Sequence, residues 1–408
     1  MTDQLTRSPS ALRVVLVNPL YRGATLALFF WGLGFSAAAP QIARFLVEEL
    51  GASLTVAGFY YLTNLTAVVA GYIVGRRSDR TGRRLGPFRL CAVAGFLGWA
   101  GIASSTELWM PFVISALVLG FAGAATSQLF AAIHDALAAD TSSVGDGVVS
   151  YVRMSLTLGW VVGPVAGAFL AAQLGLRAML AATAVCTLAQ LLPLGALRDR
   201  TPMAPGGAAH QAASPASRTH VPLKTMRPLL VFTGLYVLVY AGEPIKYAYL
   251  PIYMEAQNYP PALSGIIIGV QPLIELILMP AAVVVARWIG MLNLMVLGAL
   301  FGVGANVLFA VSGSPAGLLA GQILMGGVWG VFAGLGIIVA QRLLPQAIAT
   351  ASAIFISAPA VSSALGGLIG GLGVAAVGLP WVFLAPGGLA LAASFGLMLL
   401  QRQSPVRI

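Results

Sequence analysis

The feature that most constrains this chain is a series of long, continuous apolar runs, which recurs from about residue 22 to residue 400. A helix that crosses a bilayer needs roughly 20 apolar residues. A transmembrane barrel would instead show short segments of alternating polarity. Since helices satisfy every backbone polar group within lipid, the sequence predicts an all-α integral membrane protein.

The composition excludes the other broad classes of protein. Hydrophobic residues make up 59% of the 408 residues and charged residues only 8%, whereas soluble domains carry about 25% charged residues. Disordered chains combine low hydrophobicity with high charge and are excluded as well. At about 34 residues for each helix with its loop, the length predicts twelve transmembrane helices.

The apolar windows fall into two sets of six, separated by a segment rich in Pro, Ala, Gly and Ser that is typical of a flexible linker. We therefore expect an N-terminal six-helix bundle in residues 1–197, a cytoplasmic linker in 198–226 and a C-terminal six-helix bundle in 227–408. The predicted spans lie near residues 22–46, 53–75, 86–104, 109–138, 147–173, 177–197, 227–254, 262–286, 290–312, 315–341, 346–372 and 379–400.

The net charge of +10 comes from 22 Lys and Arg against 12 Asp and Glu. In a soluble protein this excess would suggest nucleic acid as a partner, but in a membrane protein basic residues collect in cytoplasmic loops. Placing both termini and the linker in the cytoplasm leaves Arg44 and Arg177 as the arginines outside. We expect a lipid bilayer and no nucleic acid as partner, and neither a cleavable signal nor a disulfide framework is indicated.

The segment GRRSDRTGRR, residues 75–84, lies between the second and third predicted spans. Asp79 can face the positive N-terminal end of a neighbouring helix. Arg83 can pair with a carboxylate on another helix, because arginine favours bidentate partners, and Asp135 is the expected partner. A solvated basic loop is the plainer alternative.

This segment fits the pattern G-x3-D-R-x-G-R-R and resembles the signature loop of the major facilitator superfamily. The resemblance implies two six-helix halves that move against each other, with substrate bound between them near mid-membrane. It also implies a latch that holds the halves when the transporter faces outward, formed by Gly75, Asp79, Arg80, Gly82, Arg83 and Asp135.

A second segment, GWVVGPVAG, resembles a motif of drug and proton antiporters in the same superfamily. The resemblance implies export and a position at the interface of the halves. Glycines allow close helix approach, and proline removes a backbone hydrogen bond and kinks a helix, although generic small-residue packing is the alternative. The kink and packing candidates are Gly159, Gly163, Pro164 and Gly167.

Polar residues within the predicted spans are candidates for substrate contact, because such residues are costly in lipid. Amide side chains offer a donor and an acceptor together, which suits sugar hydroxyl groups. Tyr and Trp side chains can stack on a sugar ring, with ordinary packing as the alternative. The candidate substrate-binding residues are Asn64, Gln128, Arg153, Tyr247, Gln271 and Gln322.

Two carboxylates are candidates for proton coupling. Glu275 has no partner on its own helix, and desolvation favours the protonated form of such a carboxyl. A salt bridge from Glu275 to Arg153 or Lys246 is the alternative. Glu243 is the second candidate, but it lies three residues from Lys246 on the same helix face and is expected to pair with it.

Four segments resemble the bacterial sugar efflux transporter family: TSQLFAAIHDALAAD, SYVRMSLTLGWVVGPVAGAFLA, LSGIIIGVQPLIELILMP and GQILMGGVWGVFAGLGIIVAQRLLP. Arg153, Glu275 and Gln322 hold family-like positions, whereas His134-Asp135 replaces an expected basic-acidic pair such as Arg-Glu. The resemblance implies secondary active, proton-coupled export of sugars by alternating access across the bacterial inner membrane.

Two other functions stay open, namely a multidrug:proton antiporter and a non-transporting membrane sensor or scaffold. The amide residues favour sugars over drugs, and the intramembrane charges argue against a sensor. The sequence has no G-x4-G-K-[ST] motif for ATP-driven transport and no cluster of metal ligands. We therefore expect a monomer that is not an enzyme, has no cofactor or metal, and acts on a small sugar and protons.

Overall fold

The computed structural model describes residues 11–138, 145–195, 197 and 222–403. These residues form helices joined by short turns, without any strand. Within them, twelve helical stretches are long and apolar enough to cross a membrane. The predicted all-α fold with twelve membrane helices in two halves is confirmed.

The first half comprises the described residues up to 197, and the second half those from 222 onward. The helices of the first half are α1 (Ala11–Val17), α2 (Pro19–Ala38), α3 (Ile42–Glu48), α4 (Leu54–Phe59), η1 (Tyr60–Leu65), α5 (Thr66–Thr81), α6 (Leu85–Ala103), α7 (Trp109–Ile114), η2 (Ser115–Leu119), α8 (Gly120–Ala122), α9 (Ala124–Ala138), α10 (Gly145–Leu174), α11 (Leu176–Ala189) and η3 (Leu192–Leu194). Those of the second half are α12 (Leu223–Tyr240), α13 (Gly242–Ala256), α14 (Pro261–Ile289), α15 (Met291–Val311), α16 (Pro315–Leu343), η4 (Pro345–Ala347), α17 (Ile348–Val377), η5 (Trp381–Phe383) and α18 (Leu384–Gln403).

Several predicted spans are interrupted, which an apolar window cannot register. The second span contains a 3₁₀ segment, η1, between α4 and α5. The seventh span breaks between α12 and α13. There Pro244 lacks an N–H and crowds the carbonyl of Tyr240 four residues earlier. Interruptions of this kind in a membrane helix occur where the helix is buried in protein or lines a cavity.

The linker prediction needs one correction at its end. The helix α12 begins at Leu223, so residues 223–226 are helical and do not belong to a linker. The remaining linker residues, 198–221, lie outside the described part of the chain. The division into two separate bundles at the linker stays a prediction.

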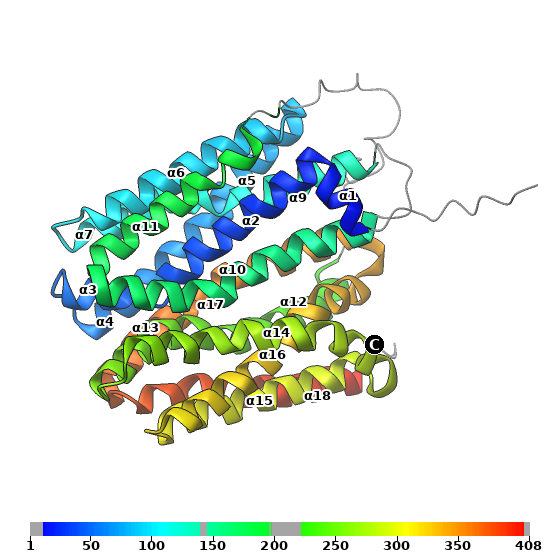
Figure 1. The fold of residues 1–408 in the computed structure, drawn as a ribbon. Helices are drawn as coiled ribbons and strands as arrows, with labels where there is room; N and C mark the ends of the chain where they lie inside the picture. The colour runs from blue at the N-terminus through cyan, green and yellow to red at the C-terminus, as the bar shows by residue number, and fades with distance from the viewer. Residues whose placement is uncertain (1–10, 139–144, 196, 198–221, 404–408) are drawn as a thin grey trace, which may run out of the picture.

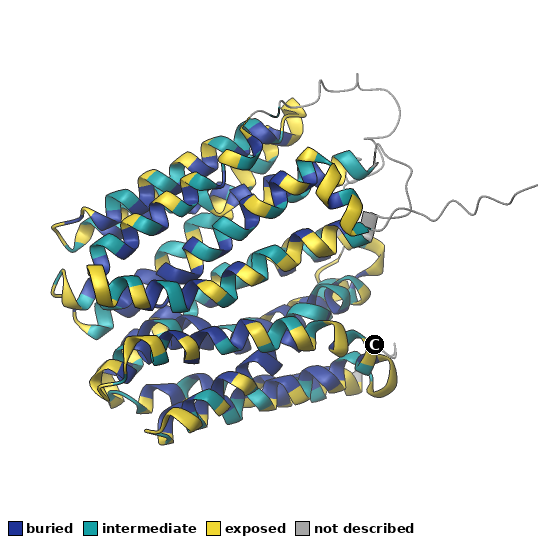
Figure 2. Cartoon of the chain, in the orientation of Figure 1, coloured by how far each residue is buried: buried dark blue, intermediate teal, exposed yellow. Residues whose placement is uncertain are grey.

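The helices run roughly parallel to one another, with the first half in the upper part of Figure 1 and the second half below it. The long helix α10 contacts α2 within its own half and α14 of the other half. Buried residues concentrate between the helices, while yellow exposed positions line the outside (Figure 2). Large apolar side chains such as Leu97, Val185 and Phe395 are more than half exposed there, as expected of a surface that faces lipid.

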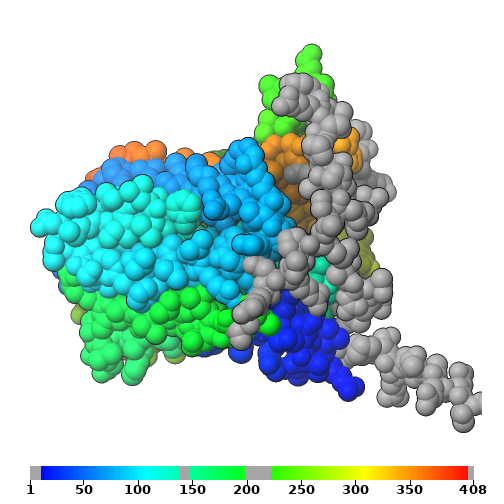
Figure 3. Space-filling view, turned by 90° about the horizontal axis from the view of Figure 1, so that it is seen from above, coloured from blue at the N-terminus to red at the C-terminus, as the bar shows by residue number. Residues whose placement is uncertain are grey.

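The two ends of the molecule are named after one residue at each. We call the end that carries Arg44, with the turns near α3, α4 and α13, the Arg44 end. We call the opposite end, where α5 closes in a left-handed turn at Gly82 (φ +65°), the Gly82 end. Seen from above, the blue surface of α5 lies beside the orange surface of α17 of the other half (Figure 3).

Candidate functional site

A cavity of about 290 Å³ lies between the halves near the middle of the spans. One wall is a single helix of the first half, α10, which contributes Arg153, Thr157 and Trp160. The other walls come from α12, α13, α14, α16 and α17 of the second half. The spacing of Arg153, Thr157 and Trp160 keeps them on one helix face, which explains how one helix can supply a whole wall.

A polar network forms the buried side of the cavity. The Nζ atom of Lys246 lies 2.6 Å from Oε2 of Glu243, which confirms the predicted pair. The side-chain amide of Gln271 donates to Oε1 of Glu243 at 2.7 Å and accepts a hydrogen bond from Lys246. The indole N–H of Trp329 also donates to Glu243. Because both charges are almost completely buried, these bonds are what makes their burial tolerable.

Glu275 and Arg153 also line the cavity, but neither belongs to this network. Glu275 is half-buried on α14, one helical turn from Gln271. Among the described residues, neither Glu275 nor Arg153 forms a side-chain hydrogen bond or an ion pair. The cavity therefore holds one carboxylate committed to partners, Glu243, and one that faces the open space, Glu275.

Aromatic rings complete the walls. Trp160 of the first half and Tyr247 of the second lie with their ring centroids 6.4 Å apart. Tyr240 packs edge-on against Trp329 at 4.4 Å, and the ammonium group of Lys246 lies 4.4 Å from the centre of the Tyr247 ring. The sequence interpretation did not select Trp160, although its spacing of seven residues from Arg153 on one apolar helix was a usable signal.

The basic loop at the Gly82 end is held within the first half. Arg84 contacts Asp135 at 2.8 Å and Asp79 at 2.5 Å. Burial disfavours the charge of Arg84, but these hydrogen bonds outweigh it, and the pKa of the guanidinium is raised. Asp135 thus partners the loop as expected, but through Arg84. The expected role of Arg83 needs correction, because it makes no ion pair among the described residues.

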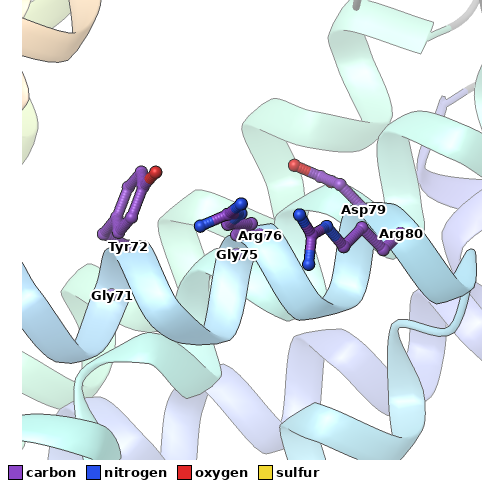
Figure 4. Close-up of a pocket in the computed structure, with 6 residues that line it drawn as sticks. All are labelled: Gly71, Tyr72, Gly75, Arg76, Asp79 and Arg80. Atoms are coloured by element: carbon purple, nitrogen blue, oxygen red, sulfur yellow. The ribbon is translucent and has the colours of Figure 1, made fainter.

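The exposed face of α5 beside this loop is hollowed (Figure 4). Tyr72, Arg76, Asp79 and Arg80 stand along it, and they line a pocket of about 500 Å³ together with Gly71 and Gly75. A side chain added at Gly71 or Gly75 would meet nothing within 4 Å. No described residue of the second half covers these two glycines in this conformation.

The glycines of the GWVVGPVAG segment face a different helix from the one expected. A Cβ at Gly159 would lie 2.6 Å from the Leu33 nitrogen, and one at Gly167 would lie 2.6 Å from the Ala37 oxygen. Both neighbours belong to α2 of the same half, so the expected position at the interface of the halves is met by Val165 of the segment and not by its glycines. The interface with α14 uses another face of α10, where Gly265 approaches Val165. The helix continues through Pro164.

The model of the Major Facilitator Superfamily matches residues 24–359, which is most of the chain. The chain belongs to the Major Facilitator Superfamily. As a superfamily member it is a membrane transporter rather than an enzyme.

Relatives of this superfamily member include named sugar exporters. A protein of Deinococcus radiodurans assigned as a sugar efflux transporter is 27% identical over 94% of this chain and 98% of the relative. Sugar efflux transporter A of Dickeya chrysanthemi is 28% identical over 84% of this chain and 86% of the relative. The resemblance to bacterial sugar efflux transporters is confirmed.

Solved superfamily structures share the fold at low sequence identity. The nucleoside transporter NupG has a TM-score of 0.78 at 16% identity, with 94% of this chain and 100% of that chain covered. The D-xylose-proton symporter has a TM-score of 0.73 at 15% identity, with 93% and 96% covered. At these identities the likeness concerns the fold alone.

Three candidate substrate residues lie away from the cavity of this superfamily member. Gln128 on α9 and Gln322 on α16 are buried in helix packing. Asn64 on η1 donates a hydrogen bond to Ser363 of α17 at 2.7 Å. Of the six candidates, the cavity brings together Arg153, Tyr247 and Gln271.

Proposed function

We propose that this chain exports sugars across the bacterial cytoplasmic membrane in exchange for protons, by alternating access to the cavity between the halves. The observation that carries this proposal is the composition of the cavity wall. A charge-balanced polar network, an amide and several aromatic rings converge on about 290 Å³. The relatives assigned as sugar efflux transporters support the same substrate class.

The charges around the cavity favour an uncharged, hydroxyl-rich substrate. Arg153 and Lys246 carry two positive charges, and Glu243 and Glu275 carry two negative charges when ionised. A neutral solute leaves this balance intact, whereas an ion would need an additional buried partner. Sugar hydroxyls can donate to or accept from the amide of Gln271, and they can donate to carboxylate oxygens. The rings of Trp160 and Tyr247 offer surfaces for the C–H face of a sugar.

Proton coupling is assigned to Glu275. The carboxylate of Glu243 is already ion-paired with Lys246 and accepts hydrogen bonds from Gln271 and Trp329, so its protonation would break these contacts. Glu275 has no such commitment and faces the cavity. Arg153, on the opposite half, supplies the counter-charge that would favour proton release as the halves rearrange.

The remaining parts of the proposal concern orientation and motion. We place the Gly82 end and both termini in the cytoplasm, because the basic residues gather there. The two bundles, residues 1–197 and 227–408, rock about the cavity. The face of α5 with Gly75, Asp79 and Arg80 would be covered by the second half when the cavity faces outward. One chain lines the whole cavity, which is consistent with a functional monomer.

The test is transport into inverted membrane vesicles with an imposed pH gradient, using a panel of radiolabelled neutral sugars. Vesicles with the protein should accumulate at least one sugar, and collapse of the gradient should abolish accumulation. Vesicles without the protein are the control. Sugar uptake that does not depend on the pH gradient would contradict the proposed exchange for protons.

A multidrug:proton antiporter is the second candidate, favoured by the free carboxylate of Glu275 beside several aromatic rings. The same vesicles, supplied with lipophilic cations, separate the two candidates, because a drug antiporter should accumulate cations and ignore sugars. A membrane sensor or scaffold would accumulate neither, and the paired charges at mid-membrane argue against that role.

A further inference from the structure

Tyr236 on α12 lines the cavity and is surrounded by other aromatic rings. Its ring packs edge-on against Phe355 of α17, with the ring centroids 4.6 Å apart, and it meets Phe332 of α16 at 6.0 Å. Tyr240, one helical turn further along α12, stacks on it at 5.7 Å. Contacts from α12, α16 and α17 therefore fix the direction of the Tyr236 ring.

The rings that hold Tyr236 are themselves confined. Phe355 lies over Gly336 of α16, where an added Cβ would come within 2.5 Å of the phenyl ring. Phe355 also stacks with Phe232 at 6.0 Å, and both Phe355 and Phe332 are buried. Because a close-packed interior leaves little room for other rotamers, Tyr236 cannot turn away from the cavity without disturbing this cluster.

The hydroxyl group of Tyr236 forms no hydrogen bond within the described part of the chain, although only 6% of the residue is exposed. A buried tyrosine hydroxyl normally has a hydrogen-bond partner. Unlike Oδ1 of Asn306, this oxygen is not among the unpaired polar atoms that are sealed inside the described structure. Since the residue lines the cavity, the hydroxyl is open to the cavity, where a bound solute can supply the partner.

The chemistry of this hydroxyl suits a neutral, hydroxyl-rich solute. A phenol group is uncharged and can both donate and accept a hydrogen bond, as a sugar hydroxyl can. An apolar solute packed against it would instead leave the hydroxyl without a partner and without water, which is unfavourable. The opposite wall of the same cavity carries Thr157 and Trp160 of α10, so a solute held between the walls lies within reach of Tyr236.

We propose that Tyr236 is a specificity-determining residue, whose hydroxyl group forms a hydrogen bond with one particular hydroxyl group of the bound sugar. The proposal rests on the transport function proposed above. A site that hydrogen-bonds a substrate hydroxyl rejects analogues that lack it, because the polar group of the protein is then left unpaired. Since the ring is fixed before the solute binds, little conformational entropy is lost when the bond forms. Tyr236 thus selects for a hydroxyl at one position of the sugar ring.

The test uses monodeoxy analogues of the transported sugar, each of which lacks one hydroxyl group, as competitors of labelled sugar uptake into inverted vesicles. Tyr236→Phe removes the phenol hydroxyl and keeps the ring. It should weaken the apparent affinity for the complete sugar by about three- to tenfold, the size of one neutral hydrogen bond. One analogue should bind the unmodified chain more weakly by the same factor and lose nothing further in Tyr236→Phe, whereas the other analogues should lose that factor again.

Two further variants separate this hydrogen bond from a general packing effect. Tyr253→Phe removes a hydroxyl from α13 outside the cavity wall, and it should leave the affinities for the sugar and all analogues unchanged. Phe355→Leu keeps the Tyr236 hydroxyl but removes one of the rings that hold it, so it should weaken binding of the complete sugar more than binding of the selected analogue. This variant also carries the test should Tyr236→Phe fail to insert.

The outcomes distinguish this proposal from the proposed function. An unchanged affinity of Tyr236→Phe for the sugar would overturn the role of Tyr236, and so would equal losses for every analogue. If either result is obtained while the unmodified chain accumulates sugar, sugar export stands and the role of Tyr236 falls. If the unmodified chain accumulates no sugar, both proposals fall.

Discussion

At the scale of single residues, the cavity contains two carboxylates in opposite circumstances. Glu243 is nearly fully buried and bonded by three groups, whereas Glu275 faces the cavity without a bonded partner in the described structure. Environments that separate two titratable groups in this way commonly assign them different roles. The sequence was sufficient to pair Glu243 with Lys246 from their spacing. It could not reveal Gln271 as the bridge, because that contact joins two different helices.

The proton-carrying role predicts the behaviour of Glu275→Gln. The amide cannot release a proton, so accumulation driven by a pH gradient should fall at least tenfold. Counterflow exchange of labelled for unlabelled sugar should persist, because exchange needs no net proton movement. Glu107→Gln, an exposed carboxylate in the turn after α6, is the control and should accumulate sugar normally. A Glu275→Gln variant that still concentrates sugar would make Glu243 the next carrier to test.

The buried ion pair of Glu243 and Lys246 leads to a prediction about folding stability that is separate from transport. Lys246→Ala removes one partner and leaves Glu243 charged in a buried site, which costs about 3–5 kcal/mol in comparable cases. Thermal unfolding in detergent should therefore shift strongly downward. The double variant Lys246→Met with Glu243→Gln removes both charges and should recover much of the loss. Equal stability of the single and double variants would contradict this account.

At the scale of helices, small residues allow neighbouring backbones to pack closely. The sequence indicated correctly that the GWVVGPVAG segment packs tightly and reaches the other half, but its glycines contact a helix of their own half instead. Small residues on a helix predict close approach and do not identify the partner, and here the partner is α2. The 3₁₀ segment η1 was equally hidden, because a hydropathy window averages its residues, YYLTNL, with the apolar residues on either side.

The packing of α2 on α10 predicts the effect of Gly163→Ala. The added Cβ would lie 1.9 Å from Oγ of Ser36 and 2.6 Å from the backbone oxygen of Leu33. The two helices must separate, at a cost of about 1–3 kcal/mol in folding free energy. Gly234→Ala on α12 is the control, since its added Cβ meets nothing within 4 Å. The higher helix propensity of alanine should raise the folding stability of this variant by about 1 kcal/mol. Unfolding of both purified variants tests this, and equal stability would refute it.

At the scale of the whole molecule, the halves touch at the Arg44 end while Gly71 and Gly75 stay uncovered toward the Gly82 end. The hydropathy pattern predicted the number of spans, because bilayer thickness sets the length of each one, and the linker between the two sets of six predicted the halves. It could not predict which end is closed, since that depends on contacts between residues such as Asn64 and Ser363, about 300 positions apart.

The latch interpretation predicts that Asp79→Asn reduces transport without unfolding the protein. Loss of a charge that meets a helix N-terminus in the outward-facing state costs about 0.3–1 kcal/mol, so we expect export to fall up to about fivefold. Membrane insertion and thermal stability should stay normal. Arg77→Gln, an exposed charge change on the same helix, is the control. Full export by Asp79→Asn would mean that the loop serves topology alone.

The 3₁₀ segment η1 has a mechanical consequence for the second span, because it joins α4, which contacts α17, to the open face of α5. A 3₁₀ helix rises about 2.0 Å and turns about 120° per residue, compared with about 1.5 Å and 100° in an α-helix. Rewinding six residues from one form to the other would shorten the span by about 3 Å and twist α4 relative to α5 by about 120°. Such a screw motion would turn a different face of α4 and of α5 toward the second half. A change of η1 from the 3₁₀ to the α-helical form would therefore alter the contacts at both ends of the span without a hinge.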